Sequence, residues 1–326
     1  MNNFEYASPE TVDSAVQLLG SGAVVLAGGT DLLSLMKDGV ATPNRLVNIK
    51  SIPELRGIED KGADGIRIGA LVTLDELMHN PLITEGYPAL VQVAEGVRSP
   101  QLENMGTVGG DLCQRPRCWY YRHGFGLLAM RDGKSMVVDG NNRYHAILGN
   151  AGPAYFVSPS SLAPALIAYG AKVGIQGSGG ARQVAVADFY KVPTAEGQRE
   201  YDLADNEVLT EIVIPPASDR KTGVYEVRER EAMDWPLVVA VASLEMDGNT
   251  VKSADVVLGQ VAPKPWPVPA AGQALSGKPV SVETAEAAGK AAVQGARPLS
   301  ENGYKVTLAR VAVKRAVLRA AGMEVT

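Results

Sequence analysis

Apolar and polar positions alternate in short blocks along the chain, and these blocks predict a mixture of strands and helices. Continuous or alternating apolar runs predict buried strands at 23–27, 46–49, 66–70 and 209–214. Apolar residues that recur every three or four positions predict helices at 10–19, 32–37 and 88–97, and a helix followed by a strand at 159–175. Because strands and helices are interspersed, the pattern indicates an α+β fold.

Two helices carry local start signals. Thr73 is followed three residues later by Glu76, a spacing in which each side chain can bond the other residue's backbone N–H. A capped helix is therefore predicted to begin at Thr73. Pro9 suits the first turn of helix 10–19, and Ser8 is its predicted cap.

The chain changes character after a polar stretch at 215–223, which we interpret as a linker. Beyond it, the pattern predicts paired strands at 225–230 and 237–246, joined by a hairpin turn at Asp247 and Gly248. Two helices are predicted to follow, at 282–294 and 304–321. We therefore expect two α+β subdomains followed by a C-terminal α+β domain, at 1–58, 59–217 and 222–326.

The composition excludes several classes of protein. The net charge of −5 argues against a nucleic-acid partner, since phosphate neutralisation needs a basic surface. No apolar run approaches the ~20 residues of a membrane-spanning helix, and the polar start at 1–9 does not resemble a secretion signal. Two cysteines allow neither a disulfide framework nor a four-thiolate metal site, and three histidines limit zinc or histidine catalysis.

Glycine is abundant, at 35 of 326 residues, and gathers in two motifs. These are LAGGTDLL at 26–33 and GTVGGDL at 106–112. Glycine permits positive φ and close backbone approach, so consecutive N–H groups can converge on a diphosphate. Both segments can equally be ordinary turns. Neither matches a P-loop or a Rossmann fingerprint, which makes a nicotinamide-binding Rossmann domain a poor interpretation.

The motifs resemble those of a known family, the FAD-binding medium subunit of the xanthine dehydrogenase and aldehyde oxidoreductase molybdenum hydroxylases. The carrying segments are FEYASPETVDSAVQLL at the N-terminus, VLAGGTDLL at 25–33, MGTVGGDL at 105–112 and LSENGYKVTLARVAVKRAVLRA near the C-terminus. CQRPRCWYYRHG and DGNNRYHAI are similar to the flavin subunit of bacterial periplasmic aldehyde oxidoreductase. The resemblance implies a two-subdomain FAD-binding fold of the PCMH and vanillyl-alcohol-oxidase type, followed by a CO-dehydrogenase-flavoprotein-like domain.

The resemblance also implies which residues bind FAD. The backbone amides of the two motifs are expected to bind the diphosphate, and their aspartates to bind ribose or ribityl hydroxyls. The expected amides are those of Gly28, Gly29, Thr30, Gly109 and Gly110, and the expected aspartates are Asp31 and Asp111. The full predicted set is Leu26, Ala27, Gly28, Gly29, Thr30, Asp31, Leu32, Gly106, Thr107, Gly109, Gly110, Asp111, Gln114, Ser161 and Leu162.

The sequence departs from the family pattern at two kinds of position. Ser161 stands where many members have a flavin-contacting Asp, and Glu226 stands where many have Lys. Some relatives carry a [4Fe–4S] cluster in the region of Cys118. Here Leu127, Ser135 and Ala146 occupy the other ligand positions, so we predict no such cluster and no metal in this chain.

Arginines and aromatic residues crowd together just after the second glycine motif, from Arg115 to His123. The arginines can neutralise phosphates while the aromatic side chains stack on a base. Alternatively, the stretch is a surface loop with cation–π pairs. A further apolar turn, 233–236, belongs either to the core or to a segment that reaches the flavin from the C-terminal domain.

The expected function is electron transfer by an FAD-containing oxidoreductase subunit. The resemblance implies a large molybdenum-cofactor subunit, where substrate is oxidised, and a small subunit with two [2Fe–2S] clusters. No catalytic base is expected in this chain. The alternatives are a stand-alone flavin oxidase with its own substrate pocket, and a scaffold subunit that has lost FAD. The expected location is the cytoplasm, or the periplasm if a partner's signal exports the complex.

Overall fold

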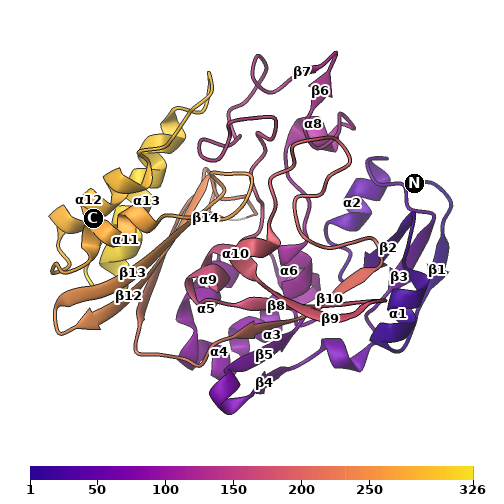
Figure 1. The fold of residues 1–326 in the computed structure, drawn as a ribbon, viewed down its shortest axis with the longest axis horizontal. Helices are drawn as coiled ribbons and strands as arrows, with labels where there is room; N and C mark the ends of the chain where they lie inside the picture. The colour runs from indigo at the N-terminus through magenta and orange to yellow at the C-terminus, as the bar shows by residue number, and fades with distance from the viewer. Residues whose placement is uncertain (232, 326) are drawn as a thin grey trace.

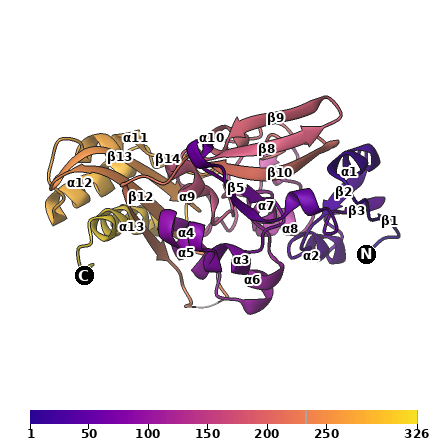
Figure 2. The same ribbon diagram turned by 90° about the horizontal axis from the view of Figure 1, so that it is seen from below.

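The computed structural model describes residues 1–231 and 233–325, and it arranges three main sheets along its long axis (Figures 1 and 2). A three-stranded sheet lies at the N-terminal end, a five-stranded sheet in the middle and a four-stranded sheet at the C-terminal end. Helices pack against each sheet. The predicted α+β fold is confirmed.

The N-terminal sheet is parallel, in the order β1-β3-β2. Its strands are β1 (Glu5–Ala7), β2 (Ala23–Leu26) and β3 (Arg45–Asn48), with α1 (Val12–Leu18) and α2 (Leu32–Lys37) as crossovers. Helix α2 has the bounds that periodicity predicts. The predicted cap of α1 was wrong, since Thr11, not Ser8, accepts a hydrogen bond from the N–H of Ser14 (3.2 Å).

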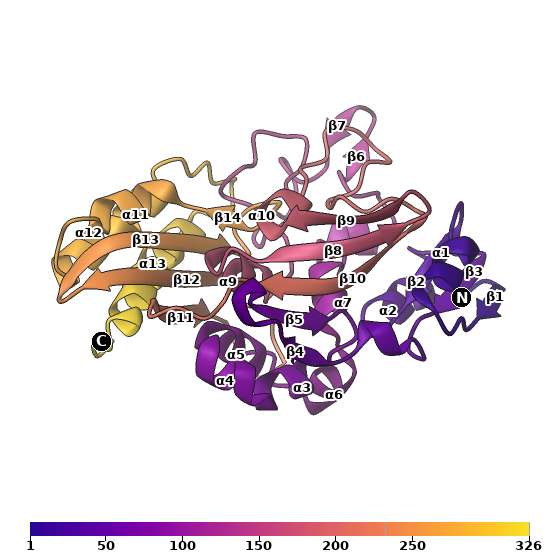
Figure 3. The ribbon, with the colours of Figure 1, turned by 60° about the horizontal axis from the view of Figure 1, so that its bottom comes forward.

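The middle sheet is antiparallel, in the order β4-β5-β10-β8-β9. Its strands are β4 (Ile58–Asp60), β5 (Ile66–Gly69), β8 (Lys172–Gly177), β9 (Gly180–Ala185) and β10 (Glu207–Ile214). The helices of this part are α3 (Leu74–His79), α4 (Pro81–Gly86), α5 (Pro88–Glu95), α6 (Pro100–Met105), α7 (Val108–Leu112), α9 (Ala163–Ala168) and α10 (Val186–Phe189). Figure 3 shows α3, α4, α5 and α6 gathered on one side of the sheet, and α10 beside the end of β9.

The predicted cap of α3 is confirmed. The Thr73 hydroxyl accepts from the N–H of Glu76 (3.1 Å), and the Glu76 carboxylate accepts from the N–H of Thr73 (2.8 Å). Leu74 and Leu77 then point into the core shared with the sheet, where the side chains of Ile68 and Ile212 are fully buried. A signal local to one turn therefore fixes where this helix joins the core.

The C-terminal domain is an antiparallel sheet in the order β11-β12-β13-β14, covered by helices. The strands are β11 (Lys221–Val227), β12 (Val238–Asp247), β13 (Thr250–Gly259) and β14 (Trp266–Pro267), and the helices are α11 (Pro269–Leu275), α12 (Val282–Ala292) and α13 (Tyr304–Ala320). The hairpin between β12 and β13 turns where predicted. The predicted linker is shorter than 215–223, because Lys221 already pairs with Leu244 in the sheet.

Helix α13 lies so close to β11 that only glycine fits at Gly223. A Cβ there would lie 2.4 Å from the carbonyl oxygen of Ala316 and 2.4 Å from the nitrogen of Ala320. Backbone atoms cannot yield without moving the helix, so the fit of α13 on the sheet depends on this missing side chain.

We predict that Gly223→Ala lowers the free energy of unfolding by about 1–3 kcal/mol, because the helix must move away from the sheet. Chemical denaturation measures the change. Gly295→Ala is the matched control in the same domain, since a Cβ there meets no atom within 4 Å. Equal stability of both variants would contradict the role of the close approach.

A long irregular segment leaves the middle domain and returns to it. It contains α8 (Trp119–Arg122) and the small hairpin of β6 (Met130–Arg131) and β7 (Lys134–Ser135). Its later part packs into the C-terminal domain, where Ile147 and Leu148 join the core and their N–H groups both bond the carbonyl of Val261. The C-terminal domain is therefore tied to the middle one by more than the linker.

Lys305 completes that attachment from helix α13. It is 1% exposed, and its ammonium nitrogen donates to the carbonyls of Gln260 (2.7 Å), Tyr144 (3.3 Å) and His145 (3.3 Å). Burial lowers the pKa of Lys305 to about 7. The same burial lowers the pKa of His145 to about 4, and the charge of Lys305 adds to that shift.

We predict that Lys305 makes stability rise with pH. Below pH 7 the lysine is charged both folded and unfolded, so the full cost of burying the charge is present. Above pH 7 the folded lysine loses its proton while the unfolded one keeps it, so that cost shrinks as pH rises. Between pH 7 and 9, the free energy of unfolding of the wild type, measured with denaturant, should rise relative to that of Lys305→Met by up to about 1.4 kcal/mol per pH unit. A pH-independent difference would contradict the shift.

Candidate functional site

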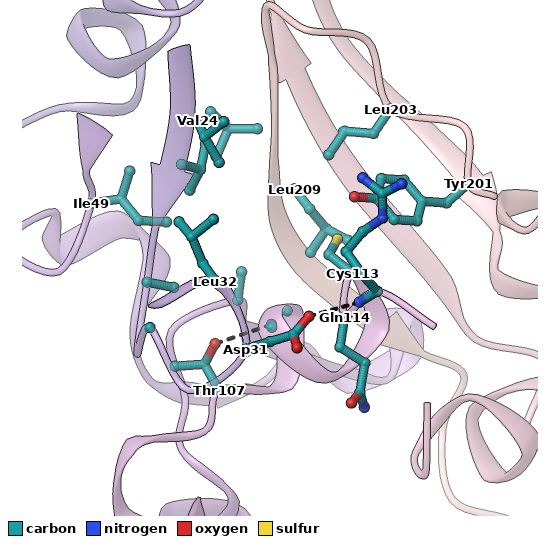
Figure 4. Close-up of a pocket in the computed structure, with 18 of the residues that line it drawn as sticks. Val24, Asp31, Leu32, Ile49, Thr107, Cys113, Gln114, Tyr201, Leu203 and Leu209 are labelled. Atoms are coloured by element: carbon teal, nitrogen blue, oxygen red, sulfur yellow. Dashed lines mark hydrogen bonds between the residues drawn. The ribbon is translucent and has the colours of Figure 1, made fainter. Parts of the chain in front are cut away.

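A cleft of about 260 Å³ separates the N-terminal sheet from the middle domain. One wall is strand β2 with the turn that follows it, and the opposite wall is the segment from Arg199 to Leu209. Figure 4 shows Val24, Leu32 and Ile49 on the first wall, facing Tyr201, Leu203 and Leu209 on the second. The floor holds Thr107 and Gln114.

The turn after β2 presents a run of free backbone donors. The N–H groups from Gly28 to Leu32 make no hydrogen bond with any described residue. Gly29 adopts a φ of +75°, which turns the chain out of the strand before α2 begins. Unpaired amides on a concave surface are a typical environment for an anion.

The two glycine motifs touch each other at Gly28. A Cβ at Gly28 would lie 1.7 Å from the carbonyl oxygen of Met105, the residue that precedes the second motif. Gly109 is similarly tight, since its Cβ would lie 2.9 Å from both the Cβ and the carbonyl oxygen of Ala70. The glycines therefore allow the loops to meet, as well as giving a ligand access.

The second motif is a short helix rather than a loop. Thr107 caps α7, and its hydroxyl accepts from the N–H of Gly110 (3.0 Å). The N–H of Gly109 bonds the carbonyl of Ala70 (2.9 Å). Thus two of the amides expected to bind a diphosphate, those of Gly109 and Gly110, are paired within the protein. The Thr107 hydroxyl can still donate its own proton into the cleft.

Asp111 bonds the protein instead of facing the cleft. Its carboxylate accepts from the Ser160 hydroxyl (2.5 Å), from the N–H groups of Leu162 (3.0 Å) and Ser161 (3.2 Å), and from Gln114 (2.9 Å). Burial raises the pKa of Asp111, and these hydrogen bonds oppose the rise. Asp111 therefore joins α7 to the start of α9.

Asp31 is also occupied by protein donors. It accepts from the N–H of Arg115 (2.8 Å) and from the guanidinium groups of Arg122 (2.8 Å) and Arg117 (3.1 Å). The arginine-rich stretch is thus fastened to the glycine turn. Arg117 also stacks on Trp235 at 4.4 Å, so turn 233–236 reaches this stretch from the C-terminal domain.

Most of the predicted binding residues line the cleft. They are Ala27, Gly28, Gly29, Thr30, Asp31, Leu32, Thr107, Gly109, Gly110 and Gln114. Other predicted residues lie behind this lining, namely Leu26, Gly106, Asp111, Ser161 and Leu162. Leu26, on β2, is buried in a cluster with Met36 of α2, whereas Ser161 and Leu162 connect to the cleft through Asp111 and Gln114.

Sequence reasoning missed the second wall. Arg199, Tyr201, Leu203, Ala204 and Asp205 line the cleft from an irregular segment that has no strand or helix period. Arg115, Tyr121 and Cys113 also line it. For the arginines there was a signal, since their crowding after the second motif indicated phosphate or aromatic partners. For the 199–205 wall there was none.

The departures from the family pattern have clear surroundings. Glu226 lies away from the cleft and pairs with Arg228 at 2.5 Å; burial raises the pKa of Glu226, and Arg228 opposes that rise. Cys118 contacts His145, with 3.2 Å between Sγ and Nε2. Burial raises the pKa of Cys113 to about 12, so this cleft-lining thiol stays protonated.

No cluster of three His, Cys, Asp or Glu side chains that could hold a metal occurs within residues 1–231 and 233–325. In the same part of the chain, no helix combines the length and hydropathy that a membrane crossing requires.

Comparison with known proteins identifies what this cleft is built for. Residues 2–217 match the family model described as the FAD binding domain in molybdopterin dehydrogenase. The chain belongs to this family. Residues 223–320 match the CO dehydrogenase flavoprotein C-terminal domain. The family predicted from the two glycine motifs is thereby confirmed.

Relatives match over nearly the full length. The carbon monoxide dehydrogenase medium chain of Hydrogenophaga pseudoflava is 31% identical over 321 residues, which cover 96% of each chain. The aldehyde oxidoreductase FAD-binding subunit PaoB of Escherichia coli is 33% identical over 292 residues, 89% of this chain and 88% of that one. Among solved structures, quinoline 2-oxidoreductase from Pseudomonas putida 86 superposes with a TM-score of 0.78 at 26% identity, covering 98% of both chains.

The cleft fits the diphosphate of FAD by its donor set. Free amides from Gly28 to Leu32 and the Thr107 hydroxyl can donate to phosphate oxygens. Apolar side chains on both walls, such as Val24 and Leu209, suit the non-polar faces of a dinucleotide.

We predict that Gly28→Ala lowers the affinity for FAD at least about tenfold, since the added methyl forces the turn away from Met105 and destabilises the fold by about 1–3 kcal/mol. Titration followed by flavin fluorescence measures the affinity. Gly179→Ala, where a Cβ meets no atom within 4 Å, is the control. Tight binding by the folded Gly28→Ala variant would contradict the proposed role of the turn.

Proposed function

We propose that this chain is the FAD-containing electron-transfer subunit of a molybdenum hydroxylase complex. Its partners would be a large molybdopterin-binding subunit, where an aldehyde or N-heterocycle is oxidised, and a small [2Fe–2S] subunit. The observation that carries the proposal is the run of unpaired amides from Gly28 to Leu32 in the cleft of a family member.

The chain's own residues would bind and orient the cofactor. When bound, FAD supplies redox chemistry that connects one-electron and two-electron partners. The amides of Gly28, Gly29 and Thr30 would donate to the diphosphate, with Thr107 adding a hydroxyl. Asp111 would act indirectly, because its hydrogen bonds fix Ser161, Leu162 and Gln114 around the far end of the cleft.

The charged groups of the cleft support electron transfer over independent substrate oxidation. Asp31 is bonded to arginines, Asp205 is paired with Arg199, and Glu207 is paired with Arg182. A general base needs a free lone pair within reach of substrate. Among the described side chains that line the cleft, these carboxylates are committed to cations, which disfavours a stand-alone flavin oxidase.

We also propose a division of the chain at 1–58, 59–217 and 222–326, which the three main sheets support. FAD would lie between the first two parts and the third would approach through turn 233–236. The complex would work in the cytoplasm, or in the periplasm if a partner's signal exports it.

Purification of the chain, alone and with its partners, tests the proposed function. The isolated chain should show flavin absorption bands after addition of FAD, and small aldehydes or alcohols should leave that flavin oxidised. In the complex, the same substrates should reduce it. Absence of flavin bands would favour the scaffold alternative, and reduction in the isolated chain would favour the stand-alone oxidase.

A further inference from the structure

The second wall of the cleft is a long irregular segment, residues 190–206, here called the strap. It leaves α10, rises toward α8 and returns to β10 (Figure 1). The N–H of Lys191 bonds the carbonyl of Glu200 (3.0 Å), so the outgoing and returning halves meet at their base. The returning half then lines the cleft from Arg199 to Asp205.

Two sets of contacts hold the strap in place: one joins it to its own sheet, and the other joins it to Arg115. Arg182 on β9 pairs with Asp202 (3.2 Å) and with Glu207 at the start of β10 (2.8 Å), which fixes the strap to its own sheet. Arg115 pairs with Glu200, with 2.5 Å between Nε and Oε1. Arg115 follows α7 and does not belong to that sheet, so its pair with Glu200 connects the strap to a different part of the cleft.

Arg115 contacts both walls of the cleft. Its backbone N–H donates to Asp31 on the glycine turn, and its guanidinium pairs with Glu200 on the strap. The guanidinium also lies 5.2 Å from the centre of the Tyr121 ring. One residue therefore bridges the turn that offers the free amides and the segment that faces it.

The pair is shielded from water and rests on the attraction of the two charges, since neither Arg115 Nε nor the Glu200 oxygens make an aligned hydrogen bond with any described residue. The Glu200 side chain is 4% exposed, against 28% for Arg115. Burial lowers the pKa of Arg115, but the Glu200 carboxylate, together with Tyr201 and Tyr121, outweighs burial, so the pKa is raised overall. Breaking a shielded pair leaves a poorly solvated charge, and such losses appear mainly in dissociation rates.

We propose that Arg115 is a clasp across the cofactor cleft, and that its pair with Glu200 sets how fast FAD leaves. This inference rests on the proposed function. A dinucleotide that spans the cleft leaves when the glycine turn and the strap separate, and that separation breaks the pair. Glu200 is thus a positioning residue that touches the cleft through Arg115 and through its neighbour Tyr201.

Glu200→Gln tests the clasp in the full chain loaded with FAD. Capture of released FAD by an excess of an FAD-specific apoenzyme, such as apo-glucose oxidase, gives the dissociation rate, and flavin quenching gives the association rate. We expect dissociation to be about tenfold faster, equal to about 1.4 kcal/mol, with association within about twofold of wild type. The exchanged pair Arg115→Glu with Glu200→Arg should restore slow release.

Glu211→Gln is the matched control. It breaks the Arg67–Glu211 pair, which is as short (2.6 Å) and lies on β5 and β10 of the same sheet, outside the cleft lining. Trypsin cleavage after Lys191 adds a readout without FAD, and it should accelerate in Glu200→Gln alone.

The possible results distinguish failure of the clasp from failure of the proposed function. Unchanged release from a folded, FAD-loaded Glu200→Gln variant overturns the clasp alone, as does an equal acceleration in Glu211→Gln. A change confined to the association rate also overturns it. A wild-type chain that takes up no FAD overturns the proposed function, and unchanged trypsin cleavage of the apo variant would then overturn the strap contact as well.

Discussion

The site depends on one close approach, that of the backbone at Gly28 to the carbonyl of Met105. This contact brings the end of β2, in the N-terminal sheet, against the segment that leads into α7 of the middle domain. The free amides and the capped helix can face one cleft only because no side chain separates them. A steric constraint on a single atom, the absent Cβ, thus fixes the geometry of the binding surface.

Two partly buried carboxylates then organise what surrounds that contact. Asp111 ties α7 to the start of α9, and Asp31 ties the glycine turn to the arginine-rich stretch. Each accepts several donors, which is how a charge is tolerated away from water. Residue types that a sequence suggests as ligands for hydroxyls serve here to position the backbone of the site.

The sequence predicted correctly those features that depend only on residues close together in the chain. The capping box at Thr73 and the bounds of α2 are set within a few residues, so the sequence pattern was sufficient for both. The roles of Asp31 and Asp111 depend on partners far along the chain, at Arg122 and Leu162, which no periodicity encodes. The strap could not be predicted for the same reason, because its irregular sequence is shaped by tertiary contacts.

Unpaired amides also explain how the cleft can bind an anion although the arginines beside it are already paired with carboxylates. Arg115 is paired with Glu200, while Arg117 and Arg122 share Asp31, so two carboxylates offset part of the charge of the three arginines before any ligand arrives. Paired cations hold the walls together, and the dipoles of unpaired amides are available to the diphosphate. Had the arginines been free, the empty cleft would carry strong repulsion between like charges. Pairing them separates the task of holding the cleft together from the task of binding what enters it.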